Sequence, residues 1–333
     1  METNNEQHKS KSTITGVNIL YLIAMVLFIS VGAFVQSRNF NTGIIITEFL
    51  LIALPPLLYV IIKRSSIKRE LRFNRLHFVD ALLVIVIFFC GYPIAVFVNL
   101  IGNIFVSFFG KLITSPIPVA SNINEYFLML LIVAASAGLC EEILFRGLIL
   151  RGYEKLGMWR GIIFTAVLFS MLHINIQNIF GPLFLGILLG YVVYVTNSIY
   201  AGMLGHFVNN GISVSIMFLL MQLPLFKDAA AQNIPAGAET LGLIVWAVII
   251  GIIAVLPCIV LVICMRTLKE LNKDKMQAVQ ADIDEIEGLR LSGVIKNPKI
   301  MWPIYISFAI FSFFSIVQAT YVITEKSIFD IIF

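Results

Sequence analysis

Nine apolar stretches, most of them about 20 residues long, constrain the fold of this 333-residue chain more than any other feature. They cover residues 17–36, 44–62, 79–98, 126–146, 162–180, 182–196, 200–221, 241–264 and 302–323. A helix of about 20 residues rises about 30 Å, which matches the hydrocarbon core of a bilayer. Only 13% of the residues are charged, which is too few to cover a water-soluble protein. The sequence therefore predicts an all-α, polytopic transmembrane helix bundle with about eight or nine spans.

Two parts of this span pattern are irregular. The sixth stretch, 182–196, is short for a full crossing and is bounded by turn signals at Gly181 and Asn197. The third stretch continues into an apolar, Phe-rich segment, 99–113, which we interpret as a second half-helix or an interfacial segment.

The basic residues predict the orientation. If the N-terminus is cytoplasmic, all but four of the 23 Lys and Arg residues fall in cytoplasmic segments, the four being Arg38, Lys111, Lys227 and Lys326. This bias is what the positive-inside rule expects of a multi-pass protein of the cell membrane. The net charge of +4 then reflects topology, and lipids rather than nucleic acid are the expected surroundings. We interpret the first stretch as a retained anchor, because it lacks a convincing signal-peptidase site.

Three regions follow from the spacing of the spans. We expect an N-terminal membrane region at 1–124, with about three spans and the interfacial segment, and a four-span core at 125–222. A C-terminal region at 223–333 carries two spans joined by a charged cytoplasmic linker, 266–300. The linker mixes acids and bases, so we interpret it as a solvated helical connector.

Ionisable side chains are rare inside the spans and collect in the central four. A charge at the centre of a bilayer costs several kcal/mol, so such residues are usually functional. Glu142 and Arg146 are one helical turn apart and can pair, which leaves Glu141, about 100° around the helix, open to a different environment. The plainer interpretation of this pair is a structural ion pair at the membrane boundary.

The other polar residues of the core show the same one-turn spacing. His206 and Asn210 can point at one spot, and Phe169 lies one turn from His173. Glu141 and both histidines are expected at depths within about 8–18 Å of the inner membrane edge. Either histidine alone is equally well explained as a hydrogen-bonding tie between helices.

Two polar residues outside this pattern have structural interpretations. Glu48, four residues into its predicted span near the outer face, is expected to be an interfacial or packing residue. Asn209 is expected to form hydrogen bonds between helices.

Three motifs in this order resemble the CAAX protease and bacteriocin-processing family, which includes the type II CAAX prenyl endopeptidases. They are Glu141-Glu142-x-x-x-Arg146, then Phe169-x-x-x-His173, then His206-x-x-x-Asn210, on successive spans. The resemblance covers about residues 126–218 and none of the three motifs departs from the family pattern.

The resemblance implies a glutamate-dependent intramembrane endopeptidase without a cofactor. Glu141 would be the general base for a water that His173 helps to hold, and His206 with Asn210 would stabilise the oxyanion. Glu142 and Arg146 would maintain the shape of the site. Such chemistry suits a polar cavity open to the cytoplasm, because a carboxylate in a low-dielectric site is a competent base.

Two alternatives remain open at this stage. One carboxylate and two histidines also form a ligand set for catalytic zinc, which would make the chain a zinc-dependent membrane protease. The same cluster could serve a non-catalytic immunity or transport-type membrane protein, although we find no internal repeat of the transporter kind.

The substrate is expected to be a peptide or protein presented from the cytoplasm or the inner leaflet and cleaved near its C-terminus. A lipidated segment is compatible with a site in the membrane. The Ile-, Lys- and Asn-rich composition resembles that of a bacterium of low GC content, which favours a pheromone or bacteriocin precursor.

Overall fold

A computed structural model describes four ranges of the chain, 12–113, 118–224, 238–291 and 301–324. Helices make up 87% of the structure, and no strand occurs in these ranges, so the predicted all-α class is confirmed. Lys227 and Lys326, used above for the orientation, lie outside the described residues, as do positions 292–300 of the linker.

Within the described ranges, seven helices are long and apolar enough to cross a membrane: Ile14–Arg38, Phe40–Ile62, Phe78–Ser107, Ile123–Leu156, Ile199–Leu220, Glu239–Leu271 and Trp302–Thr324. Two shorter apolar helices, α10 (Met158–Leu172) and α11 (Phe180–Thr196), correspond to the fifth and sixth predicted stretches. The chain is therefore a multi-pass membrane protein, while nine crossings stay a prediction.

Three of the long helices alternate between α-helical and π-helical turns. The first is α1 (Ile14–Leu27), η2 (Phe28–Gly32) and α2 (Ala33–Arg38). The second is α3 (Phe40–Ile46), η3 (Thr47–Ala53) and α4 (Leu54–Ile62). The fourth is α7 (Ile123–Met129), η4 (Leu130–Ala135), α8 (Ser136–Glu142), η5 (Ile143–Ile149), α9 (Leu150–Tyr153) and the 3-10 turn η6 (Glu154–Leu156).

The sequence explains one of these π-helical segments. Pro55 and Pro56 at the start of α4 have no N–H, so carbonyl groups one turn earlier lose their α-helical donors. The wider hydrogen-bonding pattern of η3 lies directly before these two prolines. Such π turns rotate and displace the side chains of a helix and are frequent at functional sites.

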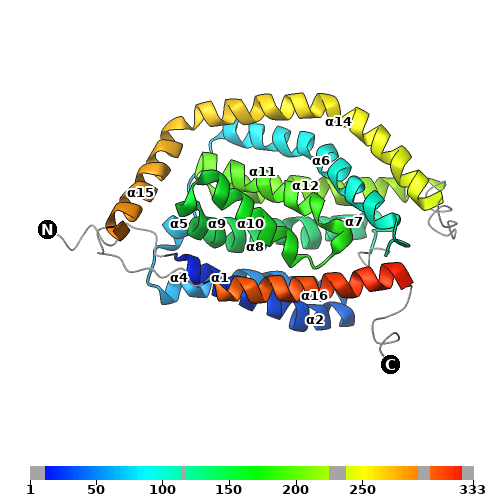
Figure 1. The fold of residues 1–333 in the computed structure, drawn as a ribbon. Coiled ribbons are helices and arrows are strands. Elements are labelled where there is room, and N and C mark those ends of the chain that lie inside the picture. The colour runs from blue at the N-terminus through cyan, green and yellow to red at the C-terminus, as the bar shows by residue number, and fades with distance from the viewer. Residues whose placement is uncertain (1–11, 114–117, 225–237, 292–300, 325–333) are drawn as a thin grey trace.

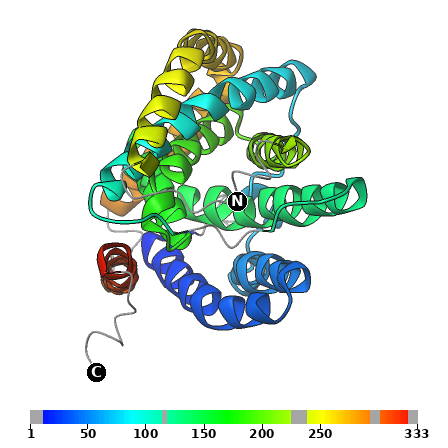
Figure 2. The ribbon, with the colours of Figure 1, turned by 90° about the vertical axis from the view of Figure 1, so that its right-hand side faces the viewer.

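The remaining helices complete a bundle with three layers (Figures 1 and 2). They are α5 (Ile67–Glu70), α6 (Phe78–Ser107), η7 (Ile176–Asn178), α12 (Ile199–Leu220), α14 (Ala238–Leu271), α15 (Lys273–Leu291) and α16 (Trp302–Thr324). In Figure 1, α6 and α14 run side by side along one side of the bundle, and the first two spans with α16 run along the opposite side. The spans from α7 to α12 lie between these two layers and so form the centre of the protein.

Two predicted boundaries are wrong. The segment 99–113 does not begin a separate half-helix, because α6 continues without interruption to Ser107 with Pro93 inside it. Membrane helices accommodate such a proline through their neighbours. The fifth stretch, 162–180, ends as a helix at Leu172, and Ile174 has a left-handed backbone with φ 45°.

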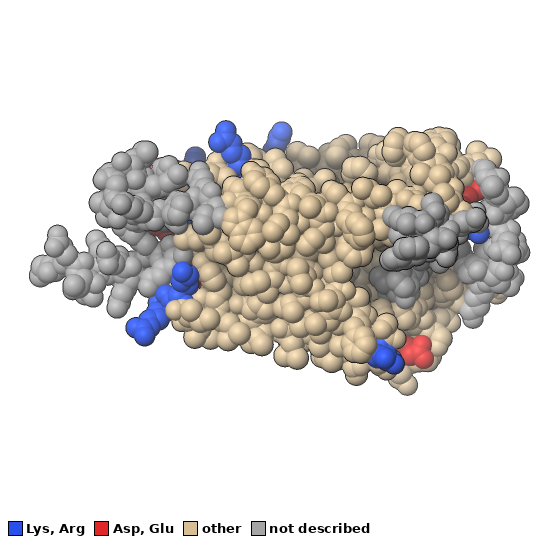
Figure 3. Space-filling view, turned by 60° about the horizontal axis from the view of Figure 1, so that its bottom comes forward, with Lys and Arg blue, Asp and Glu red and all other residues tan. Residues whose placement is uncertain are grey.

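The outer surface of the bundle is apolar. Along α14, Ile252 is 70% exposed and Leu256 is 69% exposed, which water would disfavour and lipid would accept. Figure 3 shows a face whose broad central part carries no charged side chain, with Lys, Arg, Asp and Glu at its margins. The surface therefore agrees with a membrane-embedded bundle.

The charged linker is helical in its described part and contacts the bundle. Val279 and Ile283 of α15 are buried, and α15 packs against α11 and η6. Asp80 near the start of α6 accepts a hydrogen bond of 2.8 Å from Asn272, at the junction of α14 and α15. In its described part the linker is thus helical and packs against one end of the bundle, rather than being wholly solvated.

Candidate active site

The predicted ion pair forms in the centre of the bundle and includes a histidine. Arg146 Nη1 donates to Glu142 Oε1 at 2.7 Å, and His206 Nδ1 donates to the same oxygen at 2.9 Å. All three side chains are almost fully buried. The predicted ion pair is therefore present inside the bundle, where it ties the fourth span to α12, while its place at a membrane boundary stays a prediction.

A glycine on α12 permits this close approach. A Cβ atom at Gly202 would lie 2.5 Å from Glu142 Oε2. The Glu142 carboxylate is already held in place by Arg146. One turn along the other helix, a Cβ atom at Gly138 would lie 3.2 Å from the backbone of Met203. Small residues at both positions therefore bring the carboxylate within reach of His206.

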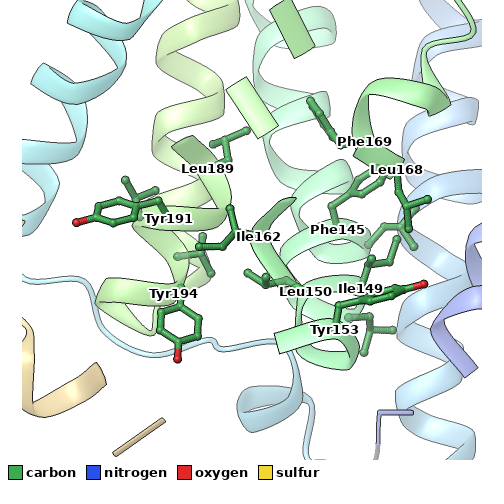
Figure 4. Packing of buried hydrophobic residues seen from close by; sticks show 14 of the residues in the cluster. Phe145, Ile149, Leu150, Tyr153, Ile162, Leu168, Phe169, Leu189, Tyr191 and Tyr194 are labelled. Atoms are coloured by element: carbon green, nitrogen blue, oxygen red, sulfur yellow. The ribbon is translucent and has the colours of Figure 1, made fainter. Parts of the chain in front are cut away.

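The ring of Phe169 joins the second and third motifs. It lies 5.1 Å from the ring of His173 and 5.7 Å from that of His206, between ring centroids and with edge-to-face geometry. The guanidinium carbon of Arg146 is 4.4 Å from the same centroid, within the range of a cation–π interaction. Phe169 is fully buried, and Figure 4 shows it at the edge of the apolar core beside Phe145 and Leu168.

His173 lies in a loop and not inside a helix. His173 directly follows α10. The 15 residues of α10 rise only about 22 Å, whereas the hydrocarbon core is about 30 Å thick. His173 Nδ1 is 2.9 Å from the carbonyl oxygen of Phe169, and because a carbonyl can only accept, Nδ1 carries the proton. The other ring nitrogen, Nε2, is therefore the acceptor of the neutral imidazole.

Two polar side chains that the sequence analysis missed support the His173 loop. Gln318 of α16 donates to the carbonyl of Ile174 at 2.5 Å and accepts from the backbone N–H of Ile176 at 2.9 Å. Asn99 of α6 donates to the carbonyl of Gln177 and accepts from the N–H of Gly181, both at 3.1 Å. Amide side chains within otherwise apolar spans were the available signal, because irregular backbone at membrane depth needs such partners.

Asn210 contacts the π-helical part of the fourth span. Its amide Nδ2 donates to the carbonyl of Val133 in η4 at 3.4 Å, and its Oδ1 accepts from Asn209 at 3.1 Å. The structure therefore places Asn210 one turn above His206 on α12, with both residues directed at the fourth span. Asn209 was expected to form a hydrogen bond between helices, but the bond that it donates goes to Asn210 on the same helix.

Glu141 has a neighbour that the sequence analysis placed elsewhere. The structure sets Glu48 eight residues into the second span, where it is 7% exposed and interacts electrostatically with Glu141. Segment η3, which contains Glu48, packs directly against α8. One oxygen of each carboxylate, Oε2, is buried without a hydrogen-bond partner. Glu48 is therefore packed inside the bundle, which is one of the two roles expected for it, and it lies deeper in its helix than predicted.

The acidic and imidazole side chains do not form an evident metal centre. Across the described ranges, no group of three or more His, Cys, Asp or Glu side chains is placed to hold a metal ion. His206 directs Nδ1 to Glu142, which leaves only Nε2 for any other partner.

These features define a class: a polytopic helical membrane protein with a buried acid and imidazole cluster in its central spans. Residues 123–212, about a quarter of the chain, match the family model described as type II CAAX prenyl endopeptidase Rce1-like. The predicted resemblance to the CAAX protease family is thus confirmed over this segment. The match implies a peptidase, and it contains all seven predicted site residues. No curated protein and no solved structure matches the chain in the same comparisons.

Proposed function

We propose that the protein is a glutamate-dependent intramembrane endopeptidase that needs no metal. The observation that carries this proposal is the gathering of both imidazoles around the Phe169 ring, with Arg146 on the same ring, inside the segment that matches the family. A carboxylate with an unpartnered buried oxygen, Glu141, directly precedes the ion-paired Glu142.

In the proposed reaction, Glu141 accepts a proton from water as the water oxygen attacks the scissile carbonyl carbon. The neutral His173 accepts a second hydrogen bond from that water at Nε2, because Phe169 fixes its proton on Nδ1. The peptide bond then breaks as Glu141 returns its proton to the leaving amine. No group outside the chain is required for this proton balance.

The proposed oxyanion donors are His206 and Asn210. Glu142 accepts from His206 Nδ1, so in the proposed reaction Nε2–H of the imidazolium form would donate to the developing oxyanion. Arg146 keeps Glu142 in place, which makes Glu142 and Arg146 positioning residues. One oxyanion donor of this kind contributes about 3–4 kcal/mol to the transition state.

We further propose that the site is reached from the cytoplasm or inner leaflet of the cell membrane, with the N-terminus cytoplasmic. The positive-inside bias of the sequence supports this orientation. The substrate would be a membrane-associated peptide or protein cut near its C-terminus, and a lipidated one is compatible with this access.

The test compares peptides from cells that produce either the wild-type protein or Glu141→Gln, followed by cleavage of the candidates by purified protein in vesicles. We expect a set of C-terminal fragments that appears in cells with the wild-type protein and not in cells with Glu141→Gln. The cleavage rate of the purified variant should be lower by about 10²–10⁴-fold. The exposed Glu270→Gln serves as the matched control. Full cleavage by Glu141→Gln would contradict the proposal. Stoichiometric zinc together with inhibition by chelators would favour the metalloprotease alternative.

A further inference from the structure

Glu48, which is buried, and Glu141, which is half-buried, are two neighbouring carboxyl groups contributed by different spans. Glu48 lies 14 residues before the end of the second span at Ile62, and Glu141 lies 15 residues before the end of the fourth span at Leu156. The two residues therefore lie at similar distances from the ends of their helices. The packing of η3 on α8 puts the two segments that carry them in direct contact, close enough for the two carboxyl groups to influence each other electrostatically.

The surroundings of this pair contain too little positive charge for two carboxylates. The elements that pack against η3 carry these other titratable or charged side chains: Tyr21, Tyr59, Cys140, Glu142 and Arg146. Arg146 is the sole cation in this set, and it already holds Glu142 at 2.7 Å. His206 of α12, which packs against α8, donates to the same oxygen of Glu142. Both basic side chains near the pair are thus engaged with Glu142, and the three acidic side chains, Glu48, Glu141 and Glu142, share them.

Two neighbouring carboxyl groups in a low-dielectric site cannot both be ionised without a large electrostatic penalty. Each of the two also has a buried Oε2 atom without a hydrogen-bond partner. A single proton shared by the pair removes one charge and supplies a hydrogen bond between the two groups.

We propose that Glu48 is a positioning residue for Glu141, and that the two carboxyl groups hold one proton between them. This inference rests on the proposed function for its catalytic meaning. Protonated Glu48 donates a hydrogen bond to one oxygen of Glu141, which leaves the other oxygen of Glu141 for the water. When Glu141 takes a proton from that water, both groups are neutral, and the proton later leaves with the amine.

The primary experiment is infrared spectroscopy of the full-length protein in lipid vesicles, recorded without substrate as the pH is varied. We expect a protonated-carboxyl stretching band in the wild-type protein at neutral pH. The band should disappear in Glu48→Gln and shift in frequency in Glu141→Gln, because its hydrogen-bond acceptor is then an amide. Glu270→Gln should give the wild-type spectrum.

Three results would overturn the inference: no such band in the wild-type protein, an unchanged band in Glu48→Gln, or an unchanged frequency in Glu141→Gln. The first of these needs no variant, so the test stands even if a substitution prevents folding. The infrared spectrum is recorded without substrate. If the protein cleaved no peptide, the proposed function would be contradicted but the infrared result would be unaffected. Conversely, Glu141-dependent cleavage by a protein that lacks the band contradicts the shared proton alone.

Kinetics then separate positioning from general stability. Glu48→Ala should lower kcat by about 10²-fold with little change in KM, since Glu141 loses its orientation. Glu48→Gln should restore most of kcat, because its amide N–H can donate to Glu141 as the carboxyl proton does. It should also keep its activity at alkaline pH values at which the wild-type pair loses the shared proton. Equal kcat losses and equal pH profiles for Ala and Gln would indicate a merely structural role.

Discussion

Two buried clusters of charge stabilise this bundle, and they differ in their balance of acids and bases. The central cluster contains Glu48, Glu141, Glu142, Arg146 and His206. The end cluster contains Arg72, Arg151 and Glu154, where Arg72 and Arg151 both donate to Glu154, the latter at 2.8 Å. The central cluster is rich in acids and the end cluster is rich in bases.

The buried polar atoms that lack hydrogen-bond partners also differ between the two clusters. In the central cluster they include one carboxylate oxygen on each of the three glutamates. In the end cluster they are guanidinium nitrogens of Arg72 and Arg151. Burial lowers the pKa of Arg72, which lies between spans, and the charge of Glu154 opposes that shift. Buried charge alone therefore does not identify a catalytic site, whereas carboxylate oxygens without hydrogen-bond partners suit a group that receives a proton.

The largest expected effect on stability comes from removing the cation of the central cluster. Arg146→Ala leaves Glu142 buried with only His206 as its partner and should lower the free energy of unfolding by about 3–5 kcal/mol. Equilibrium unfolding in mixed micelles measures this change. Arg160→Ala, at an exposed position, should have little effect. A loss below about 1 kcal/mol in Arg146→Ala would show that the pair is replaceable.

The sequence predicted those parts of both the fold and the site that depend on local spacing. Each of the nine apolar stretches contains a helix, although the fifth is helical only as far as Leu172. The pairs Glu142–Arg146 and Phe169–His173 follow from the one-turn rule. The bond from His206 to Glu142 joins residues 64 positions apart, and no local spacing encodes it.

Glu48 shows why the rest of the site was missed. The predicted span began four residues before it, whereas the helix begins at Phe40, so the residue lies deeper than expected. A π-helical segment also contains it, and a π turn changes the 100° relation on which face predictions depend. Its neighbour Glu141 belongs to another span, and the sequence alone does not place two spans side by side.

The second prediction addresses the end cluster. Glu154→Gln removes the one carboxylate shared by Arg72 and Arg151 but keeps an oxygen that can accept. It should lower the free energy of unfolding by about 2–3 kcal/mol, because hydrogen bonds to charged groups are lost. Cleavage of the peptides identified above should stay at the wild-type rate in the folded fraction. A large fall in kcat would mean that the two clusters are coupled.

The third prediction concerns the contact between the fourth span and α12. Gly202→Ala places a methyl group against Glu142 Oε2 and should cost about 1–2 kcal/mol of stability through overpacking. Activity should fall as well, since the bond from His206 to Glu142 is displaced. The matched control on the same helix is Gly211→Ala, whose Cβ would meet only Leu130 at an ordinary 3.8 Å. Equal effects of the two substitutions would show that the close approach at Gly202 is unimportant.

The smallest expected effect lies outside both clusters, where α15 contacts the start of α6. Lys275 Nζ is 3.4 Å from Asp80 Oδ2 and its side chain is 32% exposed, so the interaction is weak and open to solvent. Lys275→Ala should cost at most about 0.5–1 kcal/mol of unfolding free energy, and added salt should reduce the difference. Asn272→Ala should cost more, because its amide donates to the buried Asp80 at 2.8 Å. If Lys275→Ala proved the more damaging of the two, α15 would be held by charge. An exposed base would then contribute more to the unfolding free energy than a buried hydrogen bond does. Burial would not be the property that separates strong ion pairs from weak ones in this protein.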